Sequence, residues 1–226
     1  MDRPRPLRSS GSRRNHVGPP PAGHFATSAQ KVRSAELMGR QNRTIRDHGL
    51  GEFAVLANAM VVDPAMLIWL DGQKNTAKAA NENLGRELME LFTLGVGHYS
   101  EEDVRAAAKA LTGWKVNRDT GAVTFNAKQH DNSVKTVLGT TGPLDAHGLV
   151  DVLVKNPASP RFIAQRLWSR TVSNTPPPDD VLARLVKAGT IRDLVKAIVA
   201  DNPLYIRDRE HWEKTSIAAE SAAFAS

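Results

Sequence analysis

The spacing of apolar residues changes twice along this chain, and it predicts helices, then a short β segment, then helices again. Phe53, Leu56 and Met60 recur at i, i+3 and i+7, which is typical of one face of a helix. Between residues 114 and 125 the apolar period shortens to about two. This change predicts a hairpin, closed by Gly121 in a turn that requires a positive φ. The helical period returns at about residue 145.

These periods predict a mostly α fold, an irregular helical domain with a small β-hairpin insertion near residues 114–126. The core helices are expected over residues 50–62, 82–94, 101–112 and 160–172. Residues 130–139 are predicted either as a third short strand or as an extended loop. Earlier in the chain, Gly39 is expected to interrupt the first helical stretch.

Capping residues mark the ends of the helix predicted over 82–94. Asn81 is expected to cap its start, and Gly95 is expected to end it in the left-handed conformation. A rotation of about 100° per residue predicts a buried stripe of four residues, Leu84, Leu88, Leu91 and Phe92. It also predicts a ladder of alternating charge on the opposite face, formed by Glu82, Arg86 and Glu90.

Glu87 lies at the edge of the leucine stripe, so its carboxylate is expected to be partly buried and to need a partner. Glu87 and Glu90 are spaced i, i+3, and such a pair can share a cation if a histidine approaches from elsewhere. The first hypothesis is therefore a metal-assisted hydrolytic site. Its expected metal ligands are His24, Glu87, Glu90 and His130, with Glu87, Glu90 and His130 as the catalytic groups.

The second hypothesis gives the same polar residues a structural role in a non-catalytic binding module that is exported or associated with the cell envelope. Arg46 would then pair with Glu87, Asp131 would pair with Lys135, and Arg86 would belong to the charge ladder. Either hypothesis leaves the substrate open, and a divalent metal is the one cofactor that these residues suggest. Gly-x-Gly-x-x-Gly, phosphate-loop and Gly-x-Ser-x-Gly motifs are absent, so nucleotide, flavin and serine-hydrolase chemistry have no support.

Composition narrows the class of protein further. The 226 residues are 41% hydrophobic and contain no cysteine, which excludes disulfides, thiolate nucleophiles and Cys-based zinc sites. The net charge is +6, but the arginine-rich segment 1–22 carries +4 of it, so nucleic-acid binding is not expected. No apolar run is long enough to span a membrane, and no secretory signal is recognisable, so the compartment and the partners stay open.

Several segments resemble one large bacterial family, the domain of unknown function 1800 (DUF1800). They include "HFATSAQKV", "NENLGRELMELFTLGVGHYSEEDVRAAAKALTGW" and "HDNSVKTVLG", and the resemblance extends from about residue 24 to about residue 208. The resemblance supplies no established activity, and it implies relatives that are longer and often exported. The polar residues that match the family pattern are His24, Arg46, Asp63, Asn81, Glu82, Asn83, Arg86, Glu87, Glu90, Asp103, His130, Asp131 and Lys135.

Both ends depart from the family pattern, as expected of a truncated or frame-shifted product. Residues 1–22 are expected to be a disordered basic tail, 23–208 the helical domain, and 209–226 a ragged end. If the flanking helices of the family are missing, apolar faces should be exposed and the domain marginally stable. The exposure is expected on the stripe of Phe162, Leu167 and Trp168 and on the outer face of the helix over residues 50–62.

Overall fold

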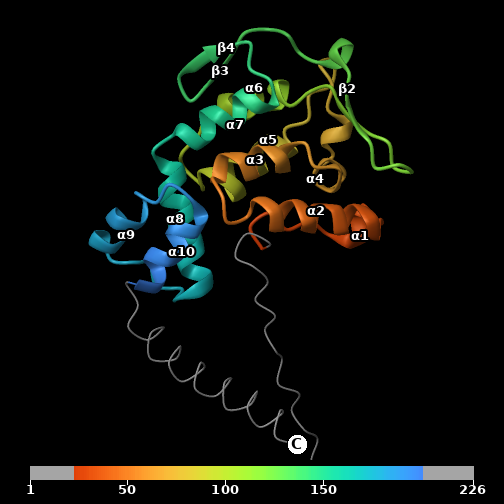
Figure 1. Ribbon diagram of the computed structural model, residues 1–226. Coiled ribbons are helices and arrows are strands. Elements are labelled where there is room, and N and C mark those ends of the chain that lie inside the picture. The colour runs from red at the N-terminus through yellow and green to blue at the C-terminus, as the bar shows by residue number, and fades with distance from the viewer. Residues whose placement is uncertain (1–22, 201–226) are drawn as a thin grey trace, which may run out of the picture.

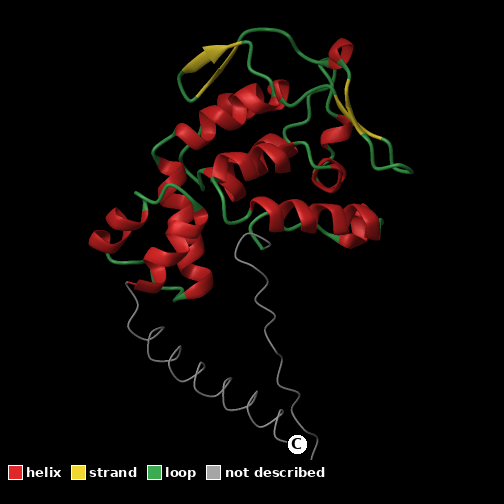
Figure 2. Ribbon diagram, viewed as in Figure 1, coloured by secondary structure: helices red, strands yellow, loops and turns green. Residues whose placement is uncertain are grey.

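The computed structural model describes residues 23–200, and helices make up most of this part (Figure 2). The predicted mostly α fold is confirmed. The helices are α1 (Ala29–Val32), α2 (Ala35–His48), α3 (Phe53–Val61), α4 (Pro64–Trp69), α5 (Asn83–Glu87), α6 (Glu101–Ala110), α7 (Ala146–Lys155), α8 (Ala158–Thr171), α9 (Asp179–Leu185) and α10 (Ile191–Ala200). The short 3₁₀ segments are η1 (Gly72–Lys74) and η3 (Ala127–Gln129), and η2 (Leu88–Thr93) is a π-helix. The strands are β1 (Trp114–Val116), β2 (Val123–Phe125), β3 (Lys135–Val137) and β4 (Thr140–Gly142).

Side-chain caps fix the starts of several helices. Ser100 accepts from the Asp103 amide while Asp103 accepts from the Ser100 amide, so a capping box fixes the start of α6. The expected interruption at Gly39 is wrong, because α2 continues through it. The break lies earlier, at Arg33, whose φ of 55° ends α1 in the left-handed region before Ser34 caps α2.

The segment 81–95 ends as predicted, but it begins one residue later, at Asn83 with Glu82 in the N-cap position, and it is not a regular α-helix. Asn81 accepts from the Asn83 amide at 2.9 Å, and Gly95 has the expected positive φ, 84°. Between these ends, α5 changes into the π-helix η2. A π-turn adds one residue per turn, so it rotates the side chains that follow relative to an α-helix. Leu84, Leu88 and Phe92 are buried as predicted, whereas Leu91 is exposed.

The strands form two separate antiparallel hairpins. In β1–β2, Trp114 lies opposite Phe125, and Gly121 has the predicted positive φ, 67°. The segment 130–139 contributes β3, which pairs with β4 in a second hairpin that the sequence patterns did not predict. The backbone amide of Leu138, in the turn of this hairpin, donates to the Asp103 carboxylate at 2.7 Å. The second hairpin is thereby held against the first turn of α6.

Most of the hydrophobic core lies among α2 to α7, where α3 packs on α7 and α5 packs on α6 (Figure 1). A second cluster is formed by α8, α9 and α10, which lie together at one end of the molecule. Phe53 packs against both clusters. The expected exposure of the α8 stripe is wrong, because Leu167 and Trp168 are buried against α9 and α10.

The predictions for 1–22 and 209–226 lie outside the described residues. Within 23–200, no helix combines the length and the apolar character that a membrane crossing requires.

Candidate functional site

His24 lies in a cage of aromatic side chains where the two hydrophobic clusters meet. The residue is 8% exposed, and the ring centroids of Phe25, Phe53 and Phe92 lie 4.9, 5.7 and 6.0 Å from its own. Its Nε2 is 2.7 Å from the carbonyl oxygen of Phe92, in η2. Because a carbonyl oxygen can only accept, Nε2 carries the proton and donates it. This bond ties the start of the described chain to the π-helix.

The environment of His24 keeps its imidazole neutral at pH 7. Burial lowers the pKa of His24 from 6.5 to about 4, the bond to Phe92 opposes this effect, and the charges of Arg166 and Arg170 add to it. His24 therefore provides a neutral ring with one fixed hydrogen bond, and it adds no positive charge to the two arginines beside it.

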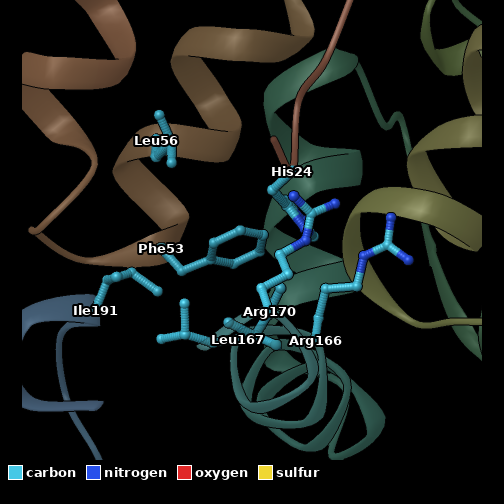
Figure 3. A pocket seen from close by; sticks show the side chains of 8 residues that line it. His24, Phe53, Leu56, Arg166, Leu167, Arg170 and Ile191 are labelled. Atoms are coloured by element: carbon cyan, nitrogen blue, oxygen red, sulfur yellow. The ribbon is translucent and has the colours of Figure 1, made fainter. Parts of the chain in front are cut away.

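Arg166 and Arg170 come from one face of α8, where the i, i+4 spacing places them side by side. Figure 3 shows both side chains beside His24, with the Arg170 guanidinium next to the imidazole. Within residues 23–200, neither guanidinium has a hydrogen-bond or ion-pair partner, and the Nε of Arg166 is buried without an acceptor. Burial and the charge of Arg166 lower the pKa of Arg170. The structure thus contains two adjacent cations that lack a counterion.

An apolar hollow adjoins these arginines. Its walls come from α3, α8 and α10 (Figure 3) and consist of Phe53, Leu56, Ile163, Leu167 and Ile191. Gly23 lies close against Arg170, because a Cβ at this position would lie 2.0 Å from an Nη of the guanidinium. A larger residue at position 23 would therefore displace the guanidinium.

A second hollow shares His24 and Arg166 with the first. Trp69, Leu91 and Phe92 line it together with Glu87. Burial and the negative charge of Glu90 raise the pKa of Glu87, although the charge of Arg86 opposes them. Among the described residues, none donates a hydrogen bond to the Glu87 carboxylate. The first hollow is thus cationic and the second carries an unpaired carboxyl group.

Glu90 and Arg86 have partners on the surface beside this site. Glu90 accepts from the Tyr99 hydroxyl at 2.8 Å, and burial together with this carboxylate raises the pKa of Tyr99 to about 12. Arg86 pairs with Glu82 at 3.1 Å, as the helical spacing predicts, but its other partner is Glu101 at 2.7 Å. Glu90 therefore belongs to a pair with tyrosine and is not part of the predicted ladder.

His130, Asp131 and Lys135 lie near the hairpins and line neither hollow. His130 Nδ1 is 3.0 Å from the carbonyl oxygen of Thr112, and the Asp131 amide donates to the Thr112 hydroxyl. Lys135 is buried, and its ammonium donates to the backbone oxygens of Asp131 and Ser133 and lies 3.8 Å from the Asp131 carboxylate. These contacts fix the loop that leads into β3.

Among the described residues, two expected groupings do not form: the set of metal ligands and the pair of Arg46 with Glu87. Within residues 23–200, no three histidine, aspartate or glutamate side chains lie close enough together to hold a metal ion. His24 and Glu87 share a hollow, whereas Glu90 bonds to Tyr99 and His130 lies at Thr112. The expected pair between Arg46 and Glu87 is also corrected, because Arg46 is exposed on α2 and lies outside the second hollow.

Sequence reasoning missed the two arginines that dominate the site. Their i, i+4 spacing next to Ile163 and Leu167 on the buried stripe of α8 was the available signal. This spacing did not single out the two arginines, because arginines that flank an apolar stripe commonly extend to solvent. In the structure Arg166 is half-buried and Arg170 is exposed, and both line the hollow beside His24.

The comparisons with known proteins identify a family but assign no role to the site. The family model described as "Protein of unknown function (DUF1800)" matches residues 22–215, so the chain belongs to this family. No curated protein and no solved structure matches the chain.

Proposed function

We propose that the chain is a binding module that takes a small molecule with an anionic group and an apolar body into the hollow beside His24. The proposal is carried by two guanidinium groups on α8 that have no hydrogen-bond or ion-pair partner among residues 23–200; the Nε of Arg166 is buried. Leaving a buried donor without an acceptor costs about 1–3 kcal/mol. A bound carboxylate or phosphate would supply the missing acceptors in bidentate geometry.

The two hollows beside His24 differ in the groups that they can take. The first has apolar walls but a volume of only about 30 Å³, so the body of a ligand would lie in the second hollow, which measures about 320 Å³ and is lined by Trp69, Leu91 and Phe92. His24 is neutral and its Nε2 proton is already donated to Phe92, so the anionic group of the ligand would be bound by the two arginines. This arrangement favours the non-catalytic hypothesis, because a binding site of this kind needs no reacting group.

The test is a calorimetric titration of the full chain with 4-methylpentanoate, a branched aliphatic carboxylate. We expect Arg170→Gln and Arg166→Gln each to weaken binding by about 10-fold or more, since hydrogen bonds to charged groups contribute about 1.5–3 kcal/mol. Arg161→Gln is the matched control, because Arg161 is exposed on the same helix and lines neither hollow. Absence of binding at millimolar ligand, or an equal loss in Arg161→Gln, would contradict the proposal.

Metal-assisted hydrolysis at Glu87 is the second candidate, because burial raises the pKa of Glu87 and a bound cation would supply the partner that its carboxylate lacks among residues 23–200. This candidate predicts that the purified protein contains a divalent metal and that Glu87→Gln loses it. The absence of a group of three ligands among residues 23–200 gives it less support than the binding hypothesis.

A further inference from the structure

His24 and Arg166 are the two residues that line both hollows. They lie close enough together that the charge of Arg166 lowers the pKa of His24. Figure 3 shows the same neighbourhood, with the side chains of Arg166 and Arg170 beside the imidazole. A group bound by Arg166 would therefore lie beside the ring of His24.

The imidazole of His24 has one nitrogen atom that can still form a hydrogen bond. Nε2 donates its proton to the Phe92 carbonyl oxygen at 2.7 Å, so Nδ1 of the neutral ring carries no proton and can only accept. No group within residues 23–200 donates to Nδ1. In this part of the chain, completely buried side-chain nitrogen or oxygen atoms without a partner belong to Trp114, Gln129 and Arg166. Nδ1 of His24 is therefore an unused acceptor that has some accessible surface.

We infer that the ligand of this site is a 2-hydroxy carboxylate, with its carboxylate at Arg166 and Arg170 and its hydroxyl group donating to Nδ1 of His24. This inference rests on the proposed function and specifies its ligand class. A 2-hydroxy acid carries the two groups on adjacent carbon atoms, so one small head group can contact an arginine and the ring beside it. Its apolar body would lie in the second hollow, which His24 and Arg166 also line.

The charges around His24 favour a hydroxyl group over an ammonium group as the donor. Arg166 and Arg170 lower the pKa of His24 because they disfavour a further positive charge at the ring. An ammonium group beside Nδ1 would meet the same repulsion, whereas a neutral hydroxyl group would not. Glu87 lines the second hollow, and its carboxyl group would disfavour a second negative charge on the ligand. The expected ligand is therefore a monocarboxylate with a neutral donor.

The test compares 4-methylpentanoate with 2-hydroxy-4-methylpentanoate, which differs from it only by the hydroxyl group, in calorimetric titrations of the full chain at pH 7. Each enantiomer of the hydroxy acid is titrated separately. We expect the tighter enantiomer to bind on the order of 5-fold more tightly than 4-methylpentanoate, which is the contribution of one hydrogen bond between neutral groups.

His24→Gln should remove this preference, because glutamine can still donate to Phe92 but has no acceptor at the position of Nδ1. His98→Gln is the matched control, because His98 is exposed and lines neither hollow. The control should keep the preference of the wild-type chain.

Two further ligands make the test independent of any variant. 2-Methoxy-4-methylpentanoate keeps the oxygen atom but cannot donate, so it should bind no more tightly than 4-methylpentanoate. L-leucine carries an ammonium group in the same place, and it should bind more weakly than the hydroxy acid. Both comparisons apply even if His24→Gln does not fold.

The outcomes separate this inference from the proposal on which it rests. Equal affinities for 4-methylpentanoate and both enantiomers of the hydroxy acid, with Arg170→Gln weakening all of them, would overturn the hydroxy acid and leave the anion site in place. A preference that persists in His24→Gln would also overturn it, as would a methoxy compound or leucine that binds as tightly as the hydroxy acid. If no ligand binds at millimolar concentration, or if Arg166→Gln and Arg170→Gln do not weaken binding, the proposed function itself fails.

Discussion

At the scale of single residues, His24 shows how strongly the surroundings decide what a side chain can do. The sequence places it before the first helices among small residues, where a histidine commonly lies on the surface. In the structure it is enclosed by three phenylalanines and bonded to the Phe92 carbonyl. The acceptor could not be anticipated, because it belongs to a residue 68 positions later in an irregular helix.

The burial of His24 predicts a loss of stability in mild acid. Its folded pKa of about 4 lies below the ordinary 6.5, so the unfolded chain takes up this proton first. The stabilisation is fully present above pH 6.5 and is lost as the pH falls toward 4. The difference corresponds to about 3 kcal/mol at about 1.36 kcal/mol per pKa unit.

The measurement is the free energy of unfolding by urea across pH 4–7, for the wild type and for His24→Gln. Glutamine can still donate to Phe92 but does not titrate, so it is expected to show a shallower decline in this range. The difference between the two curves isolates His24 from the carboxylates that titrate in both proteins. Parallel curves would mean that His24 is protonated as easily in the folded chain as in the unfolded one.

At the scale of elements, the sequence indicated where the segment 81–95 ends, because turn and capping residues are recognisable. It did not indicate correctly which side chains of the segment are buried. Asn81 and Gly95 act locally, so the sequence could identify them. The buried stripe assumed about 100° per residue throughout, and the π-helix η2 breaks this assumption. Leu91, which was predicted to be buried, is 39% exposed, and Met89, which was not part of the predicted stripe, is 0% exposed. The same rotation brings Leu91 into the second hollow beside Glu87.

This rotation predicts opposite costs for two truncations in the same turn. Met89→Ala should lower the free energy of unfolding by about 2–5 kcal/mol, because it leaves a cavity in the core. Leu91→Ala should change it by about 0.5 kcal/mol or less, as for other substitutions on the surface. Urea unfolding of both variants at pH 7 gives the comparison. A larger cost for Leu91→Ala would mean that the segment is a regular α-helix in solution.

At the scale of the whole molecule, the sequence indicated the helical class and most helices, because amphipathic periodicity is a local property. How the helices group depends on contacts between distant segments. The burial of Trp168 depends on the packing of α9 and α10 against α8, and the second hairpin is held through the Leu138 amide and Asp103. The candidate site is a property of this grouping, since its walls come from both clusters.

The contacts between the two hydrophobic clusters predict that α3 and α10 unfold cooperatively. Phe53 packs against both clusters, and the Ile191 amide donates to the Gly51 carbonyl at 2.9 Å. Hydrogen exchange at pH 7 should therefore give similar protection to the buried amides of both helices. In Phe53→Ala we expect the α10 amides to exchange on the order of 10-fold faster than those of α3, because the second cluster can then open separately. Phe125→Ala is the matched control, since Phe125 is 45% exposed on β2 and lies outside this contact. If the α10 amides already exchange much faster than the α3 amides in the wild type, the two clusters are not coupled. In that case a ligand held between the clusters should slow exchange in α10.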